Sequence, residues 1–313
     1  MAEKLATREA YGSTLVELAD KYDFVVLDAD LAEATKTIKF KKACPERFFD
    51  CGIAEGNMMS VAAGIATTGK TVFASSFAMF AAGRAFEQVR NSIGYPHLNV
   101  KIGATHAGIT VGEDGATHQC NEDIALMRTI PGMTIVNPSD AIEAKAAVEA
   151  AMTTNGPFYL RFGRFAVPII NDNPEYKFEL GKGICVADGK DVTIVATGLM
   201  VSMALEAKEL LAKEKIDARI VNIHTIKPID KEILAKAAKE TGALVTAEEH
   251  NIIGGLGAAV TEAICESCPV PVIRVGMNDI YGHSGTVPAL LEAYGLTPEK
   301  IAEAAKKAIS MKK

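Results

Sequence analysis

Short, continuously apolar segments rich in Val and Ile alternate with longer helical patterns along the whole chain of 313 residues. A strand that is buried on both faces has no polar side, so its sequence is a continuous apolar run rather than an alternation. Strands that are separated by helices are joined by crossovers, which makes neighbouring strands parallel. The sequence therefore predicts an α/β fold with mostly parallel sheets and helices on both faces of each sheet.

The predicted strands form two groups. In the first half of the chain they are Phe24–Asp28, Thr71–Ser75, Asn99–Ala104, Thr134–Asn137 and Phe158–Phe162. In the second half they are Val192–Ala196, Ala218–Asn222, Ala243–Ala247 and Val270–Val275. The clearest helical patterns are Arg8–Lys21, Ala141–Met152, Val201–Lys213, Lys231–Glu240 and a terminal helix over residues 298–311.

Two groups of strands in a chain of this length predict two domains. The segment over residues 171–183 is polar, contains turn residues and has no clear period, which is typical of an inter-domain linker. We expect a first domain over residues 1–175, a linker over 176–190 and a second domain over 191–313.

Composition excludes several classes of protein. The net charge is −6 without blocks of like charge, so nucleic-acid binding is not expected, and the short basic cluster at Lys39, Lys41 and Lys42 is interpreted as a solvated turn. The first residues lack the apolar core of a signal peptide, and the sequence holds no run of 18 apolar residues, so no membrane span is expected. Six scattered cysteines, including the Cys265–Cys268 pair, indicate ordinary thiols in a reducing cytoplasm.

Glu55 begins a segment whose other residues are almost all small or apolar, up to Ala66. Burial disfavours the charged form of a carboxyl and raises its pKa, so such a group can donate a proton near neutral pH. A glutamate in the first turn of a helix also favours the helix dipole, needs no function there and has its pKa lowered. The segment itself leaves both interpretations open.

Two further segments carry side chains suited to ligand binding. Phe77 and Phe80 are three residues apart, which places both rings on one helical face, either as core packing or as a platform for a flat ring. A glycine-rich loop with His106, Asp114 and His118 follows a predicted strand, where open α/β sheets bind ligands. Its histidine and aspartate spacing matches no recognised metal site, so no metal is expected here.

The chain resembles the transketolase type of thiamine-diphosphate enzymes, because these segments occur in that family's order and residues 112–119 are close to its GEDGPTHQ signature. The resemblance implies that Glu55 bonds the aminopyrimidine ring and drives formation of the cofactor ylid. It also implies that Phe77 and Phe80 line the ring. Asp30 falls near the thiazolium, with Asp28 as a close competitor.

The same resemblance implies a sugar-phosphate substrate. His106, Asp114 and His118 would face the sugar, with both imidazoles assisting proton transfers. Arg164 matches a phosphate-binding arginine by its distance from Pro168, and Arg161 lies at the end of the last predicted strand of the first domain, just before Arg164.

Arg8 matches a second phosphate-binding arginine more loosely, and a surface salt bridge is the alternative for Arg8 and for Arg164. One position departs from the family pattern: Gly83 stands where transketolases usually have a tyrosine. The run Gly83–Gln88 is more similar to the deoxyxylulose-phosphate synthase branch.

The second half resembles the C-terminal domain of the family, with hallmarks at residues 195–198, 226–230, 246–250 and 253–257. The last of these is glycine-rich but lacks the third glycine of a dinucleotide-binding fingerprint, so we interpret it as a tight turn. The resemblance implies that this domain is mainly structural and supports a dimer.

The Gly-Asp-Gly signature that holds magnesium and the cofactor diphosphate does not occur in this sequence. We therefore expect the small, C-terminal subunit of a split transketolase, acting with a partner subunit that carries the diphosphate and Mg²⁺, in a complex such as a heterotetramer. The expected reaction transfers a two-carbon ketol unit from a ketose phosphate to an aldose phosphate. The alternatives are another two-subunit thiamine-diphosphate enzyme, either deoxyxylulose-phosphate-synthase-like or a 2-oxo acid dehydrogenase beta subunit, and a non-catalytic assembly subunit.

Overall fold

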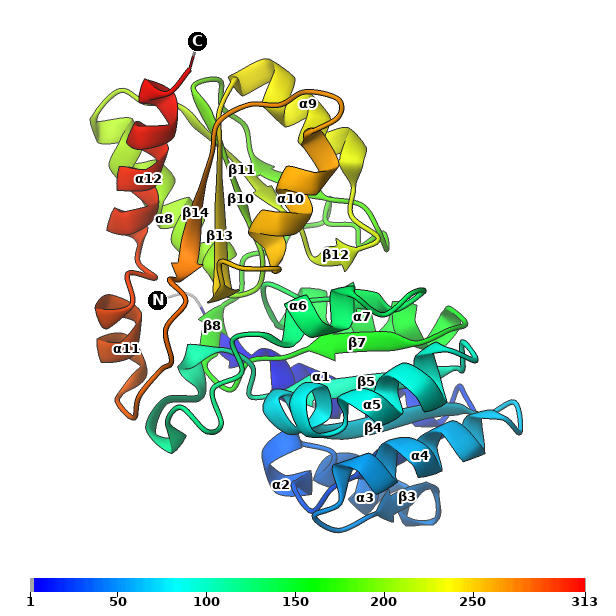
Figure 1. Ribbon diagram of the computed structural model, residues 1–313. Coiled ribbons are helices and arrows are strands. Elements are labelled where there is room, and N and C mark those ends of the chain that lie inside the picture. The colour runs from blue at the N-terminus through cyan, green and yellow to red at the C-terminus, as the bar shows by residue number, and fades with distance from the viewer. Residues whose placement is uncertain (1–2, 313) are drawn as a thin grey trace.

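A computed structural model describes residues 3–312, and its first sheet has seven strands, six of them from the first half of the chain (Figure 1). Its strands lie in the order β12-β6-β7-β5-β4-β2-β3. All neighbours are parallel except β12 and β6. The strands are β2 (Phe24–Asp28), β3 (Phe48–Asp50), β4 (Thr71–Phe77), β5 (Val100–Thr105), β6 (Thr134–Val136), β7 (Phe158–Arg161) and β12 (Thr225–Lys227).

Helices cover both faces of this sheet because consecutive strand residues point to opposite sides. In β2, Phe24 and Val26 pack toward α1, while Val25 and Leu27 pack toward α4. The α1 side holds α1 (Thr7–Ala19), α3 (Ile38–Ala43) and α7 (Ala141–Thr153). The α4 side holds α4 (Glu55–Ala66), η2 (Met79–Arg84), η3 (Val89–Gly94) and α6 (Asp123–Arg128). Short α2 (Ala32–Thr35), η1 (Pro45–Arg47), α5 (Phe86–Gln88) and η4 (Ile109–Asp114) complete this half.

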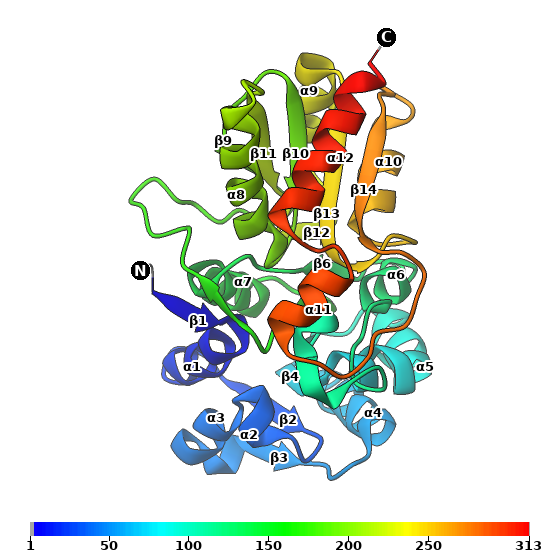
Figure 2. The ribbon, with the colours of Figure 1, turned by 90° about the vertical axis from the view of Figure 1, so that its left-hand side faces the viewer.

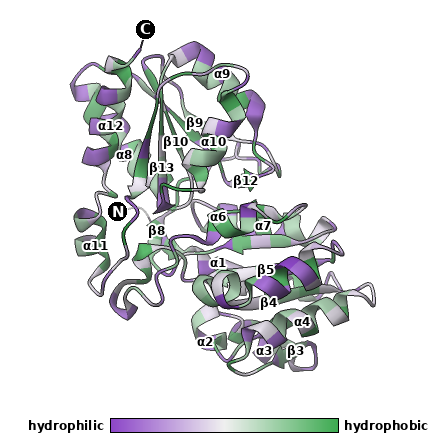
Figure 3. Ribbon diagram, viewed as in Figure 1, coloured by the Kyte–Doolittle hydropathy of each residue, from purple (hydrophilic) through white to green (hydrophobic). Residues whose placement is uncertain are grey.

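The second sheet has five strands in the order β14-β13-β10-β11-β9 and is parallel except for β9 (Figures 1 and 2). The strands are β9 (Ile184–Ala187), β10 (Val192–Ala196), β11 (Ala218–Asn222), β13 (Leu244–Asn251) and β14 (Val272–Met277). One face packs against α8 (Met200–Lys213) and α12 (Pro298–Ser310), the other against α9 (Lys231–Thr241) and α10 (Leu256–Ile264). Figure 3 shows apolar residues along the central strands of both sheets.

The α/β architecture predicted from the strand pattern is confirmed, and each predicted strand has its counterpart within a few residues. The sequence pattern did not predict the short strands, because they lack long apolar runs. These strands lie at sheet edges (β3, β9 and β12) or form a separate antiparallel pair, β1 (Lys4–Ala6) with β8 (Ala166–Pro168). The structure differs from the predicted linker at residues 184–187, which form β9. The domain boundaries themselves stay predictions.

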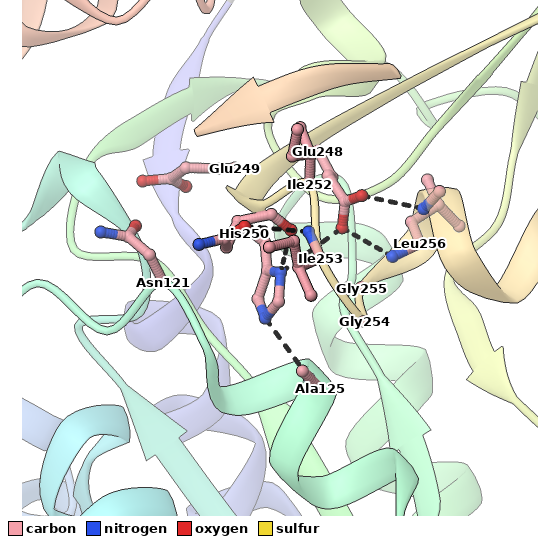
Figure 4. Close-up of polar contacts among 12 residues, drawn as sticks. Asn121, Ala125, Glu248, Glu249, His250, Ile252, Ile253, Gly254, Gly255 and Leu256 are labelled. Atoms are coloured by element: carbon pink, nitrogen blue, oxygen red, sulfur yellow. Dashed lines mark hydrogen bonds and ion pairs between the residues drawn. The ribbon is translucent and has the colours of Figure 1, made fainter. Parts of the chain in front are cut away.

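The two domains meet through buried polar contacts at the carboxyl edge of the first sheet. Arg161 at the end of β7 donates to Asp123 of α6 at 2.8 Å and to the Glu249 carbonyl of β13 at 2.9 Å. Next to this pair, His250 accepts from the Ala125 amide at 3.3 Å, while Glu248 accepts from the first amides of α10 (Figure 4). β12 adds a backbone connection, because it follows the second-domain strand β11 but pairs with β6. No helix among residues 3–312 is both long and apolar enough to cross a membrane.

Glu249 is buried at this junction, and burial raises the pKa of its carboxyl from 4.5 to about 7. The Arg161 guanidinium and the Thr110 amide lower the pKa of Glu249 and offset burial in part. Because the pKa in the folded chain lies above the ordinary value, folding favours the protonated form. This contribution to stability is complete below pH 4.5 and is lost as the pH rises through about 7.

Glu249→Gln is therefore expected to become more stable relative to the wild type as the pH rises from 4.5 to 8. The gain is on the order of 3 kcal/mol, since the amide has the same shape and never has to be charged. Thermal unfolding of both proteins across this pH range is the measurement, with the exposed Glu206→Gln as the control. A difference between Glu249→Gln and wild type that is independent of pH would contradict the shift.

Candidate active site

Strand ends bring most of the predicted site residues together at the carboxyl edge of the first sheet. Phe77 is the last residue of β4 and lies opposite Thr105, the last residue of β5, so His106 follows directly beside it. The Phe77 ring stacks on the His106 imidazole at a centroid distance of 3.8 Å and on Phe80 at 5.9 Å. The His118 ring stands edge-on to Phe80 at 5.3 Å. Both phenylalanines and both histidines thus form one aromatic cluster.

His106 is held in an unusual backbone conformation with a φ of +56°, which is rare for a residue with a side chain and is typical of functional sites. Arg8 approaches Nε2 of its ring at 3.0 Å, and Thr105 Oγ1 lies 2.9 Å from Nδ1. A guanidinium can only donate, so Nε2 accepts and Nδ1 carries the hydrogen. Burial lowers the pKa of His106 to about 3, with further contributions from Arg8 and Arg164. The imidazole is therefore neutral at physiological pH.

Glu55 is the first residue of α4 and is buried, with 1% of its side chain exposed. Its Oε2 accepts a hydrogen bond of 2.8 Å from Nη1 of Arg84, at the end of η2. The Arg84 guanidinium also lies over the Phe80 ring, 4.6 Å from the centroid, while 53% of its side chain is exposed. The buried carboxylate is thus compensated by a cation that reaches it from the surface.

Two arginines, Arg8 and Arg164, lie near His106 at the other end of the cluster. Arg164 Nη1 donates to the Val111 carbonyl at 2.5 Å and lies 3.7 Å from carboxylate oxygens of Glu113 and Asp114. Arg8 also donates to the Ala34 carbonyl at 2.9 Å. Arg8, Arg164 and Asp114 are all partly or fully accessible, so an anion at this position would meet two guanidinium groups.

Three residues that the sequence suggested for the site make no hydrogen bond or ion pair with the aromatic cluster. Arg161 is buried, and its guanidinium is directed to Asp123 and to main-chain carbonyls, so it is not open to a phosphate. Asp30 is exposed, with a φ of +62°. Asp28 is buried and accepts hydrogen bonds from Leu31, Thr35 and Thr37, which is typical of a structural carboxylate.

Sequence reasoning missed the role of Arg84, although it noted the Gly83-Arg84 departure. The signal was weak because a surface arginine usually forms no specific contact. A pocket of about 690 Å³ is lined by residues of both domains, among them Met79, Thr117, Asn251 and Tyr281. Met79 and Thr117 directly precede Phe80 and His118 in the chain.

Comparison with known proteins assigns the family. Residues 3–169 match the pyrimidine-binding domain of transketolases, and residues 181–301 match the transketolase C-terminal domain. The chain belongs to the transketolase family. The recognition made from the three sequence segments is confirmed, and relatives that are themselves a transketolase C-terminal section or a split-gene chain support the correspondence to the C-terminal part of a split enzyme.

The relatives include separate chains of similar length. A transketolase C-terminal section of Methanocaldococcus jannaschii is 52% identical over 95% of this chain and 94% of its own length. A 6-deoxy-6-sulfo-D-fructose transketolase subunit of a Clostridium species is 45% identical over 95% of this chain and 92% of its length. Human transketolase is 38% identical over 97% of this chain, which spans 49% of the human protein.

Among solved structures, a split-gene transketolase described as an inactive β4 tetramer superposes with a TM-score of 0.91. It is 53% identical, and the match covers 99% of this chain and 100% of that chain. Membership in this family implies binding of thiamine diphosphate.

The residues of this site fit one end of that cofactor. A buried carboxylate beside two stacked phenylalanines suits a flat, nitrogen-containing ring. The diphosphate end needs a divalent cation with several oxygen ligands. Within residues 3–312 no group of three or more His, Cys, Asp or Glu side chains is arranged to hold a metal ion.

Proposed function

We propose that this chain is the small subunit of a two-subunit transketolase that transfers a two-carbon ketol unit between sugar phosphates. The observation that carries the proposal is the aromatic cluster of Phe77, Phe80, His106 and His118 beside the buried Glu55, within a chain of the transketolase family. The bound cofactor supplies the nucleophilic carbon that cleaves and carries the ketol unit. The chain supplies orientation, charge and proton acceptors.

Each residue of the cluster has a role in this proposal. Glu55 hydrogen-bonds a ring nitrogen of the aminopyrimidine, while Phe77 and Phe80 line the ring, with Asp30 toward the thiazolium. His106, neutral and with Nε2 free to accept once Arg8 turns to the substrate, bonds a sugar hydroxyl, together with His118 and Asp114. Arg164 and Arg8 bind the phosphate. Arg161 is left out of the phosphate site because its guanidinium is internal.

Gly83 stands where the family usually has a pocket-lining tyrosine, and in this proposal the neighbouring Arg84 lines the pocket instead. Its guanidinium holds the Glu55 carboxylate and covers Phe80, which orients both groups toward the ring position. Of the two charged groups Arg84 is the exposed one, so it is Arg84 that moves when the ring enters.

A partner subunit completes the proposed enzyme by holding the diphosphate and Mg²⁺. We expect the isolated chain to be folded and inactive, and a mixture with the N-terminal subunit to form product from xylulose 5-phosphate and ribose 5-phosphate. The split-gene relative described as an inactive β4 tetramer supports this expectation. Product analysis of both preparations is the test, with pyruvate and glyceraldehyde 3-phosphate as the alternative pair. If product forms with pyruvate and glyceraldehyde 3-phosphate but not with the two pentose phosphates, a synthase-like enzyme is favoured. The sequence at Gly83-Arg84 is compatible with that outcome.

Glu55→Gln in the reconstituted pair is expected to lower kcat by about a hundredfold or more, with little change in substrate KM. An amide keeps the packing but, unlike a carboxyl group, cannot exchange a proton with the pyrimidine nitrogen. Glu248→Gln is the matched control, because Glu248 is also 1% exposed and lies outside the cluster. Proton exchange at the thiazolium carbon, followed by NMR, locates the defect. If proton exchange in Glu55→Gln is as fast as in the wild type, Glu55 only stabilises the start of α4 and has no role in activating the cofactor.

Arg164→Ala is expected to raise the KM for ribose 5-phosphate by about ten- to a hundredfold, with kcat nearly unchanged. A contact to a phosphate remote from the reacting carbon binds ground state and transition state about equally, and one charge-assisted bond is worth about 1.5–3 kcal/mol. Ribose, which lacks the phosphate, should be unaffected. Arg219→Ala, which removes a surface ion pair with Asp188 and Glu240, is the control. Equal losses with both sugars would show that Arg164 is structural.

A further inference from the structure

The loop that carries both active-site histidines is held from the second domain. We define residues 106–119 as the substrate loop; it begins at His106, and His118 is its penultimate residue. In Figure 1 the short helix α11 (Val287–Ala293) and the segment before it lie beside this loop, and Figure 2 shows the same arrangement from the side. Two hydrogen bonds between the domains hold the substrate loop next to α11.

Glu249 makes the first of these bonds. Its Oε1 accepts a hydrogen bond of 2.7 Å from the Thr110 amide, in the first turn of η4. Both residues are buried, at 5% and 0% exposure. Gly108 allows this contact, because a side chain there would collide with the Glu249 carboxyl, and its φ of +80° also favours glycine.

Gln119 makes the second bond at the other end of the loop. Its Nε2 donates to the His283 carbonyl at 2.9 Å and to the Gly112 carbonyl at 3.2 Å. His283 belongs to the segment between β14 and α11, and Gly282 in that segment leaves the space that the Gln119 side chain fills. The two bonds lie four residues after His106 and one residue after His118, so they bracket the part of the loop that includes Asp114 and His118, and the first of them lies one turn from His106.

The loop consists of short turns rather than of a regular helix or strand. η4 is a short 3₁₀ segment interrupted at Gly112, whose φ of +84° and ψ of −120° are not helical. A short 3₁₀ segment leaves its first amides without partners inside the helix. Glu249 supplies the acceptor for a buried amide of this kind, and its removal would leave that amide unsatisfied.

We propose that Glu249 is a positioning residue of the second domain, which holds the substrate loop so that His106 and His118 face the sugar. Glu249 and His283 hold the loop from the second domain, in addition to the contacts that Arg8 and Arg164 make with it from the first. The second domain therefore takes part in shaping the active site. The sugar-binding part of this inference rests on the proposed function, whereas the holding of the loop does not.

Glu249→Ala tests the inference in the full chain without the partner. Hydrogen exchange measured by mass spectrometry should show protection of residues 108–116 reduced by about tenfold or more, with smaller changes elsewhere. Glu249→Gln should restore the protection, because its amide oxygen still accepts from Thr110. Unchanged protection in Glu249→Ala would overturn the inference.

Glu248→Ala is the matched control. Glu248 is the preceding residue of β13 and is also buried, but it accepts from the Leu256 and Gly257 amides at the start of α10. Its removal should reduce protection of residues 256–264 and leave the substrate loop as in the wild type. If both alanine variants loosen the loop alike, Glu249 acts only through general stability and the inference is wrong.

Kinetics of the reconstituted pair add the functional measurement. Glu249→Ala is expected to raise the KM for sugar phosphates and lower kcat, with recovery in Glu249→Gln. If the wild-type pair forms no product from either substrate pair, the proposed function fails while the exchange result stands. If the pair is active and Glu249→Ala has wild-type kinetics despite a loosened loop, the positioning role in the active site is refuted.

Discussion

The buried ion pair between Arg161 and Asp123 is the interaction on which the arrangement of the two domains depends. Asp123 is 0% exposed and Arg161 3%, and Asp123 also accepts from Tyr159. The same guanidinium reaches the Glu249 carbonyl across the domain boundary. Removing one partner of such a pair typically costs about 3–5 kcal/mol, because the other charge stays buried without compensation. The first sheet and β13 are therefore fixed to each other at the edge where the site lies.

This constraint explains why the site is built from segments far apart in sequence. Parallel strands of one sheet end at the same edge, so Phe77, His106 and Arg164 converge after β4, β5 and β7. The second domain packs against that edge, and residues 106–112 of the substrate loop are buried there. Burial and neighbouring cations then keep His106 neutral, so that it can accept a hydrogen bond at Nε2 where a protonated ring would not.

The fold and the central cluster could be predicted because both depend on local signals. Continuous apolar runs marked the central strands, and the GEDGATHQ run marked the loop that carries His118. Contacts between residues that are far apart in the chain give no such local signal. Arg161 has the same sequence signature as a phosphate-binding arginine, and only its partner Asp123, 38 residues away, shows that it is internal. The pairing of β12 with β6 and the bond from Arg84 to Glu55 depend likewise on contacts between distant segments.

The substrate loop shows how domain packing and chemistry are connected in this chain. Glu249 lies at the interface with its backbone carbonyl on Arg161 and its carboxyl on the Thr110 amide. One residue thus contacts both the ion pair that joins the domains and the loop that carries the histidines. A shift of β13 against β7 would move the Thr110 end of the loop, because buried amides keep their acceptors. The packing of the second domain is therefore a condition for the geometry around His106, although that domain contributes no residue to the aromatic cluster.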